Sequence, residues 1–136
     1  MKPTYRQSTK DFSFYNRNPK NKLLASDCVA RAISIATGLS WCQVIREITE
    51  LGITLGSVFN DKKVYEAWLH KKGWVKMKQP RKLNNTKYTL TEFMKKQPKG
   101  RFLVKLAHHL TFVEDGKVYD TWNCTKKTVG NYWVQR

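Results

Sequence analysis

The chain has 136 residues, which is enough for one domain that buries roughly two-thirds of its unfolded surface and too few for two ordinary domains. Its 26 lysines and arginines outnumber its 10 aspartates and glutamates and give a net charge of +16 at pH 7. This charge favours an anionic partner, whether nucleic acid, cell-wall polymer or acidic protein, without distinguishing among them. No stretch has the length of a membrane span and the N-terminus lacks the apolar segment of a secretory signal, so the sequence predicts no membrane contact and a cytoplasmic location.

The N-terminal part of the chain differs in character from the rest. Residues 1–22 carry aromatic side chains among cations, with turn-forming residues and no regular period. The sequence therefore predicts a basic N-terminal arm over residues 1–22, lying over a single domain that spans residues 23–136. The domain opens with a helix predicted over residues 27–37, because Ser26 is a good N-cap and Gly38 supplies the left-handed stop.

The remaining elements separate into a helical first half and a β-rich second half. Helices are predicted over residues 40–52 and 61–72, a short strand over 74–77, a short helix opening at the Thr89–Glu92 capping box, and sheet after Gly100 with a last strand over 132–134. Helices followed by antiparallel strands define an α+β domain.

Asp115 and Gly116 lie between two β-rich runs and form a strong signal for a two-residue hairpin loop. With these residues as the loop, continuing the pairing along both strands places His109 directly opposite Trp122. Asp120 then becomes the diagonal neighbour of His109 on the same face, roughly 7 to 8 Å away between backbones. The sequence thus predicts a hydrogen bond between His109 and Asp120, with Trp122 shielding it from water.

The three cysteines, Cys28, Cys42 and Cys124, cannot all pair, and their spacing matches no zinc site. The sequence therefore predicts free thiols, no metal site and no cofactor. Cys28 falls in the first turn of a predicted helix, where unpaired amides favour a thiolate. A small buried apolar residue is the alternative interpretation of Cys28. With His109 as base and Asp120 as the orienting acid, Cys28 has the layout of a catalytic nucleophile.

His108 is the rival histidine. If the strand is continuous, His108 faces away from His109, opposite Asn123 and in line with Leu106 and Leu110 of the core. A bulge that shifted the register would make His108 and Asn123 the catalytic pair instead, because histidine and asparagine also form a triad pair.

A basic stretch lies between Glu66 and Glu92, where no acidic residue occurs. It contains Trp74 and seven cations: Lys71, Lys72, Lys76, Lys78, Arg81, Lys82 and Lys87. Cations interleaved with an aromatic residue can bind single-stranded nucleic acid or another anionic partner. The alternative is a solvated, lysine-rich face.

The order of these residues resembles that of the papain-like cysteine peptidases. Those enzymes place the nucleophile at the start of a central helix, the histidine at the start of a strand and an Asn-Ser-Trp segment on a following strand. Here Ser26-Asp27-Cys28 matches the nucleophile position and Asp120-Thr121-Trp122 is similar to the Asn-Ser-Trp segment. Residues 18–32 and 119–122 also look like small cysteine-peptidase-like proteins of tailed phages.

This resemblance implies a papain-like fold, in which N-terminal helices pack on a C-terminal antiparallel sheet. It implies a cysteine hydrolase, either peptidase or isopeptidase, that acts on a protein or peptide through Cys28, His109 and Asp120, in the host cytoplasm if the chain is phage-encoded. The family's oxyanion-hole glutamine has no counterpart, and Asn21 or Asn18 is the substitute candidate. Two alternatives remain: a peptidoglycan amidase, or a non-catalytic basic protein that binds nucleic acid or an acidic host protein.

Overall fold

The computed structural model describes residues 6–135, and within them it contains four α-helices and six strands. In chain order these are β1 (Phe12–Phe14), α1 (Cys28–Thr37), α2 (Trp41–Leu55), α3 (Lys62–Lys71), β2 (Trp74–Met77), α4 (Leu90–Lys96), β3 (Arg101–Leu106), β4 (His109–Glu114), β5 (Lys117–Asp120) and β6 (Tyr132–Gln135). The strands form one sheet in the order β1-β5-β4-β3-β6-β2. The α+β class is confirmed, but the sheet is mixed rather than wholly antiparallel, because β1 runs parallel to β5.

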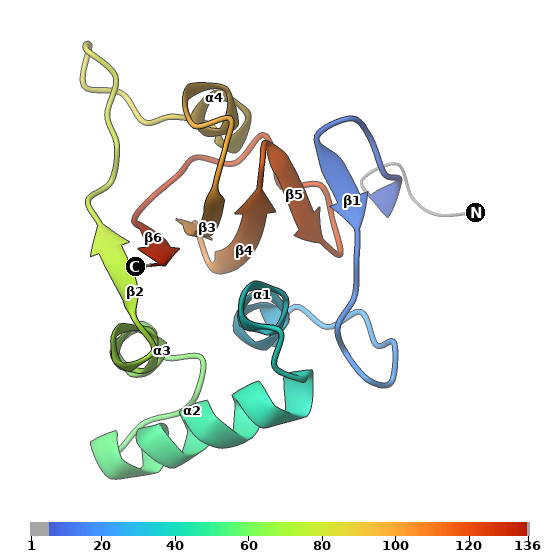
Figure 1. The fold of residues 1–136 in the computed structure, drawn as a ribbon, viewed down its shortest axis with the longest axis vertical. Helices are drawn as coiled ribbons and strands as arrows, with labels where there is room; N and C mark the ends of the chain where they lie inside the picture. Colours follow the sequence, from blue (N-terminus) through green and yellow to red (C-terminus); the bar gives the residue numbers. More distant parts are fainter. Residues whose placement is uncertain (1–5, 136) are drawn as a thin grey trace.

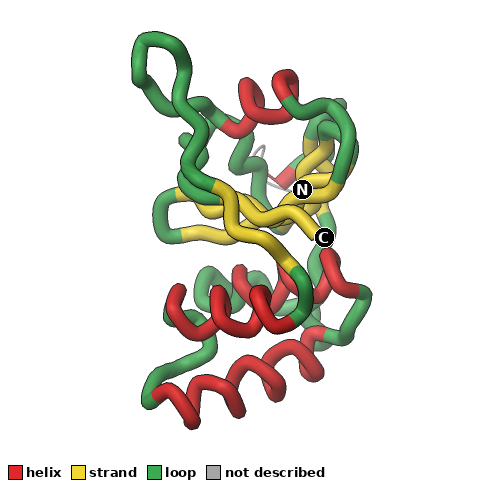
Figure 2. The backbone as a smooth tube through the Cα atoms, turned by 60° about the vertical axis from the view of Figure 1, so that its left-hand side comes forward, coloured by secondary structure: helices red, strands yellow, loops and turns green. Residues whose placement is uncertain are grey.

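The sheet lies between two helical layers. Helices α1, α2 and α3 cover one face, and the short helix α4 lies on the other (Figures 1 and 2). Each face has its own core: one gathers α1 to α3 against Leu103, Leu110, Phe112 and Trp133, and the other gathers α4 and Phe12 against Phe102, Val104, Val113 and Val118. The site described below lies where the first turn of α1 meets the sheet.

Helix α1 begins at Cys28, and the residue in the N-cap position is Asp27 rather than the predicted Ser26. The Asp27 side chain makes no capping hydrogen bond, because its carboxylate binds Arg31 and Trp41 instead. The predicted end of the helix is confirmed, since Gly38 has φ of 77° and its N–H bonds to the Ser34 carbonyl. Cys28 therefore lies in the first helical turn, as predicted.

Helix α2 is longer than predicted. It begins after its Ser40 cap but continues through Gly52 to Leu55, where Gly56 with φ of 77° ends it. Gly52 therefore does not end the helix. A Cβ at this position would lie 2.5 Å from the Ser57 carbonyl oxygen, so the absence of a side chain lets the segment after the helix pack closely against it. Thr89 and Glu92 form the predicted capping box of α4.

The predicted N-terminal arm contributes to the sheet. Part of it forms β1, which pairs in parallel with β5, and Phe12 is fully buried in the core. The arm is thus not a segment lying over a separate domain, and the boundary placed at residue 22 does not separate two parts of the fold. A strand of three residues is too short to show a period in the sequence. Residues 1–5 lie outside the described part of the chain.

Two hairpins set the geometry of the site. The β4–β5 hairpin has the predicted register, with Glu114 opposite Lys117. The β3–β4 hairpin corrects a prediction: Leu106 pairs with His109, so Ala107 and His108 form a two-residue turn. His108 has φ of 55° and is exposed. It does not line up with the core, because it belongs to the turn itself and so to neither face of the sheet.

Among residues 6–135, no single helix has both the length and the apolar character needed to cross a membrane. Helices α1 and α2 reach this length and apolar character only as a pair, and the chain bends by 113° between them.

Candidate active site

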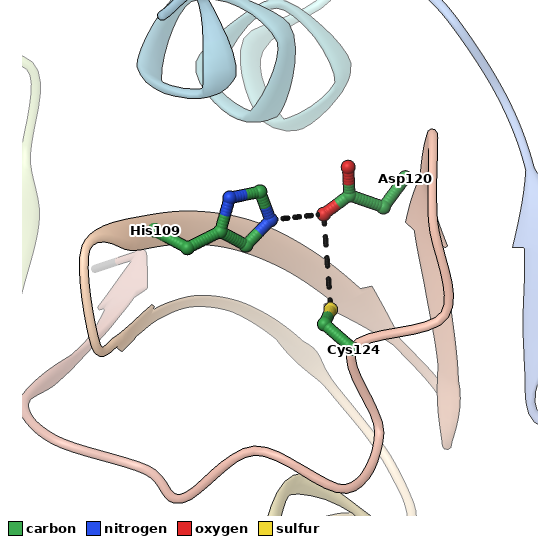
Figure 3. A group of neighbouring side chains, drawn as sticks. All are labelled: His109, Asp120 and Cys124. Carbon is green, nitrogen blue, oxygen red and sulfur yellow. Dashed lines mark hydrogen bonds and ion pairs between the residues drawn. The ribbon is translucent and has the colours of Figure 1, made fainter. Parts of the chain in front are cut away.

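His109 and Asp120 form the hydrogen-bonded pair that the hairpin register predicts. Nε2 of His109 lies 2.6 Å from Oδ2 of Asp120 (Figure 3), and the two residues are only 7 % and 4 % exposed. The indole of Trp122 stacks obliquely on the imidazole, with ring centroids 4.9 Å apart. The bond is therefore shielded from water on the side that Trp122 covers.

Asp120 is held by three further donors. The Thr111 hydroxyl donates to Oδ2 at 2.6 Å, and the Thr121 backbone N–H donates to Oδ1 at 2.7 Å. A guanidinium N–H of Arg31 approaches Oδ1 at 3.4 Å. Burial alone would raise the pKa of Asp120, but His109, Thr111 and Arg31 together lower it. Asp120 is thus a buried carboxylate with a fixed orientation.

Cys28 lies beside His109 at the first position of α1 and is 8 % exposed. Burial raises the pKa of its thiol, but a hydrogen bond to His109, the charge of His109 and the Leu110 backbone outweigh burial and lower it. For His109, burial lowers the pKa, yet the hydrogen bonds to Asp120, Cys124 and Cys28 raise it to about 11. These opposite shifts favour a thiolate paired with an imidazolium.

Arg31 belongs to this group of side chains, although no motif in the sequence singles it out. It lies one turn along α1 from Cys28, is 3 % exposed, and bridges Asp27 and Asp120. Because Arg31 pairs with Asp27, the carboxylate that directly precedes Cys28 is not left as an uncompensated charge. The spacing of four residues between Asp27 and Arg31 is the sequence feature that predicts their ion pair, since side chains four residues apart lie next to each other on a helix.

Cys124 joins the same group from the loop after β5. Its thiol lies 3.8 Å from Oδ2 of Asp120 (Figure 3), and burial raises its pKa. Ligand atoms of His109, Asp120 and Cys124 lie within 4.8 Å of one another, so these three could hold a metal ion. Oδ2 of Asp120 already accepts hydrogen bonds from His109 and Thr111, so a metal ion bound by these three residues would have to displace them.

Two adjoining cavities open on this site. One, of about 450 Å³, is lined by Cys28 and His109 together with Asn60, Lys62 and Lys105. The other, of about 370 Å³, is lined by His109 and Trp122 with an apolar pair, Leu23 and Leu24. Both are also lined by Ala25 and His108. The cavity that contains Cys28 thus shares Ala25, His108 and His109 with the second cavity.

The remaining predicted site residues lie elsewhere. Asn21 is exposed and lines neither cavity, while the Asn18 amide donates to Asp27. Asn123 accepts hydrogen bonds from the backbone and hydroxyl of Thr125, so it does not pair with His108. The structure thus brings together Cys28, His109, Asp120 and Trp122 and leaves out Asn21 and the alternative pair, because Asn21 belongs to an exposed loop and His108 to a turn.

The predicted basic stretch is distributed over α3, β2 and a loop that projects from the body between β2 and α4 (Figure 1). Lys72, Lys76 and Lys82 are paired with Glu47, Glu66 and Glu92, respectively. Folding therefore supplies partners for cations that have no acidic neighbour in the sequence.

Comparison with known proteins gives no relative for this chain: no protein-family model, no curated protein and no solved structure matches it.

Proposed function

We propose that this chain is a papain-like cysteine hydrolase, a peptidase or isopeptidase, whose nucleophile is Cys28. The observation that supports this most directly is the chain of contacts from the first turn of α1 through His109 to Asp120. In it, the pKa of the thiol is lowered and that of the imidazole raised. A thiol without such a partner is mostly protonated at neutral pH.

In this mechanism the Cys28 thiolate attacks the carbonyl carbon of an amide, and the His109 imidazolium protonates the departing amine. A thioester to Cys28 results. Water then attacks the thioester with His109 as general base, which releases the carboxylic acid and restores the pair. Asp120 holds the ring so that Nε2 faces the carboxylate, which leaves Nδ1 for the sulfur.

The developing oxyanion needs hydrogen-bond donors. The backbone N–H of Cys28 serves as one, because the first amides of a helix have no partner within the helix. Asn60 is an amide side chain that lines the cavity containing Cys28. It replaces Asn21 as the side-chain candidate for the second donor.

The test is the pH dependence of alkylation by iodoacetamide, followed separately at each cysteine by mass spectrometry, in the native protein and in His109→Gln. We expect Cys28 to react well below the pH at which an ordinary thiol ionises, and to lose that advantage in the variant. Half-buried Cys42 is the internal reference, and fully buried Cys124 should stay unmodified. If Cys28 reacts like Cys42 in both proteins, the catalytic proposal is wrong.

The projecting basic loop supports a second candidate function, a non-catalytic protein that binds nucleic acid or another anionic partner. Lys78, Arg81 and Lys87 lie along this loop, and Leu83 near its tip is fully exposed. Salt-dependent binding that Cys28→Ala leaves unimpaired would favour this function. Loss of turbidity of a cell-wall suspension that requires Cys28 would instead indicate an amidase acting on peptidoglycan.

A further inference from the structure

Two lysines from different elements border the cavity next to Cys28. Lys105 is the fifth residue of β3, Lys62 is the first residue of α3, and both line the cavity that contains Cys28. Lys105 is half-buried, which is costly for a charge that has no counter-ion. A cavity lined by two lysines, one of them without a counter-ion in the described part of the chain, is suited to an anionic group.

The partners of these lysines leave the cavity cationic. Nζ of Lys105 donates to the Leu106 carbonyl at 2.6 Å, and among residues 6–135 no carboxylate lies within ion-pair distance of it. Lys62 donates to the Asn131 side chain at 3.1 Å and lies 3.8 Å from Glu66. Glu66 is closer to Lys76, at 2.8 Å, so its charge is shared.

We propose that Lys105 and Lys62 form a carboxylate-binding site next to Cys28, so that the hydrolase prefers a substrate bearing a carboxylate close to the scissile amide. The carboxylate belongs either to an aspartate or glutamate side chain or to the C-terminus of a peptide. This inference rests on the proposed function, because it assigns the charge of the substrate at that site.

The electrostatics of the cavity agree with this assignment. Burial and the charge of Lys62 lower the pKa of Lys105, while the negative charge of Cys28 raises it. Lys105 therefore lies close enough to Cys28 for their charges to interact. An ammonium that is partly desolvated and repelled by a second ammonium gains more from a bound carboxylate than one in open water does.

The test compares three alkylating probes of the same size: the iodoacetyl derivatives of glutamine amide, glutamate amide and glutamine with a free α-carboxylate. The first is neutral, the second carries a side-chain carboxylate and the third a terminal one. At constant ionic strength we expect at least one charged probe to modify Cys28 about fivefold faster than the neutral probe, relative to Cys42 in the same molecule. The faster charged probe identifies the source of the carboxylate.

Variants assign the preference to its residues. Lys105→Met keeps the apolar stem and should abolish the preference, and the more exposed Lys62→Met should reduce it. Lys117→Met is the control, because it removes a half-buried lysine from β5, outside both cavities; it should preserve the preference. No preference in the native protein, or a preference that survives both Lys105→Met and Lys62→Met, would overturn the carboxylate site.

The neutral probe separates this proposal from the catalytic one. A low-pH alkylation midpoint at Cys28 without any carboxylate preference would overturn the site and leave the hydrolase proposal standing. An ordinary alkylation midpoint at Cys28 together with a carboxylate preference would overturn the hydrolase proposal and leave the carboxylate site standing. A Cys28 that reacts with none of the probes would contradict both.

Discussion

Asp120 is the residue on which most side chains of the site converge. It accepts hydrogen bonds from His109, Thr111 and the Thr121 backbone, and Arg31 lies within ion-pair distance. In the proposed mechanism its role has two parts: the hydrogen bond to His109 orients the imidazole, and the negative charge stabilises the imidazolium. A substitution by asparagine separates them, because an amide oxygen still accepts the Nε2–H but carries no charge.

We therefore expect Cys28→Ala to abolish turnover and Asp120→Asn to lower it less. Without the charge of Asp120, the pKa of His109 falls and the thiolate loses part of its support. The rate of Cys28 alkylation at pH 6 should drop about tenfold, as for a thiol pKa raised by about one unit. Asp115→Asn removes the same charge from the exposed tip of the β4–β5 hairpin and should leave the rate unchanged. Equal rates for native protein and Asp120→Asn would contradict the role given to the carboxylate.

At the scale of secondary-structure elements, β1 is the smallest and least expected part of the fold. It consists of three residues, Phe12–Phe14, yet it extends the sheet beyond β5. Its neighbour β5 ends at Asp120, and Phe14 pairs with that residue. The edge strand thus contributes to holding the strand end that carries the acid.

Phe12→Ala tests the contribution of β1. Phe12 is fully buried in the core beneath α4, so its truncation should lower the free energy of unfolding by about 3 to 5 kcal/mol. Tyr15→Ala, just after the strand, removes a ring that is 40 % exposed and should cost much less. Urea denaturation of both variants measures the difference. A Phe12→Ala variant as stable as Tyr15→Ala would mean that the N-terminal segment is an arm after all.

At the scale of the whole molecule, the buried charges couple the site to stability. Arg31 pairs with Asp27 and Asp120, and His109 pairs with Asp120, where α1 meets the sheet. Buried charges of this kind stabilise a fold only while each keeps its partner. Stability should therefore depend on pH through the groups whose pKa values differ between the folded and unfolded chain.

The thiol of Cys28 has a pKa lowered from 9.0 by folding. A lowered pKa contributes stability that is complete above pH 9, the range of the unfolded thiol, and is lost as the pH falls through the folded value. The free energy of unfolding of the native protein minus that of Cys28→Ala should therefore increase with pH up to about pH 9, by at most about 1.4 kcal/mol per pH unit. Urea denaturation of both proteins at several pH values measures this difference. A difference that stays constant from pH 5 to 9 would show that Cys28 is not a thiolate in the folded protein.

The sequence by itself determined the α+β class, the position of Cys28 at a helix start and the pairing of Glu114 with Lys117 that brings His109 to Asp120. These features depend on signals a few residues long: caps, a left-handed glycine and an Asp-Gly turn. Only the tertiary structure decided that Phe12–Phe14 joins the sheet, that Arg31 reaches Asp120, that His108 occupies a turn and that Lys105 lines the cavity of Cys28. The turn was not predictable because Ala107-His108 lacks the usual turn residues. The other contacts join segments that are distant in the sequence, and these form only when the helices and the sheet pack together.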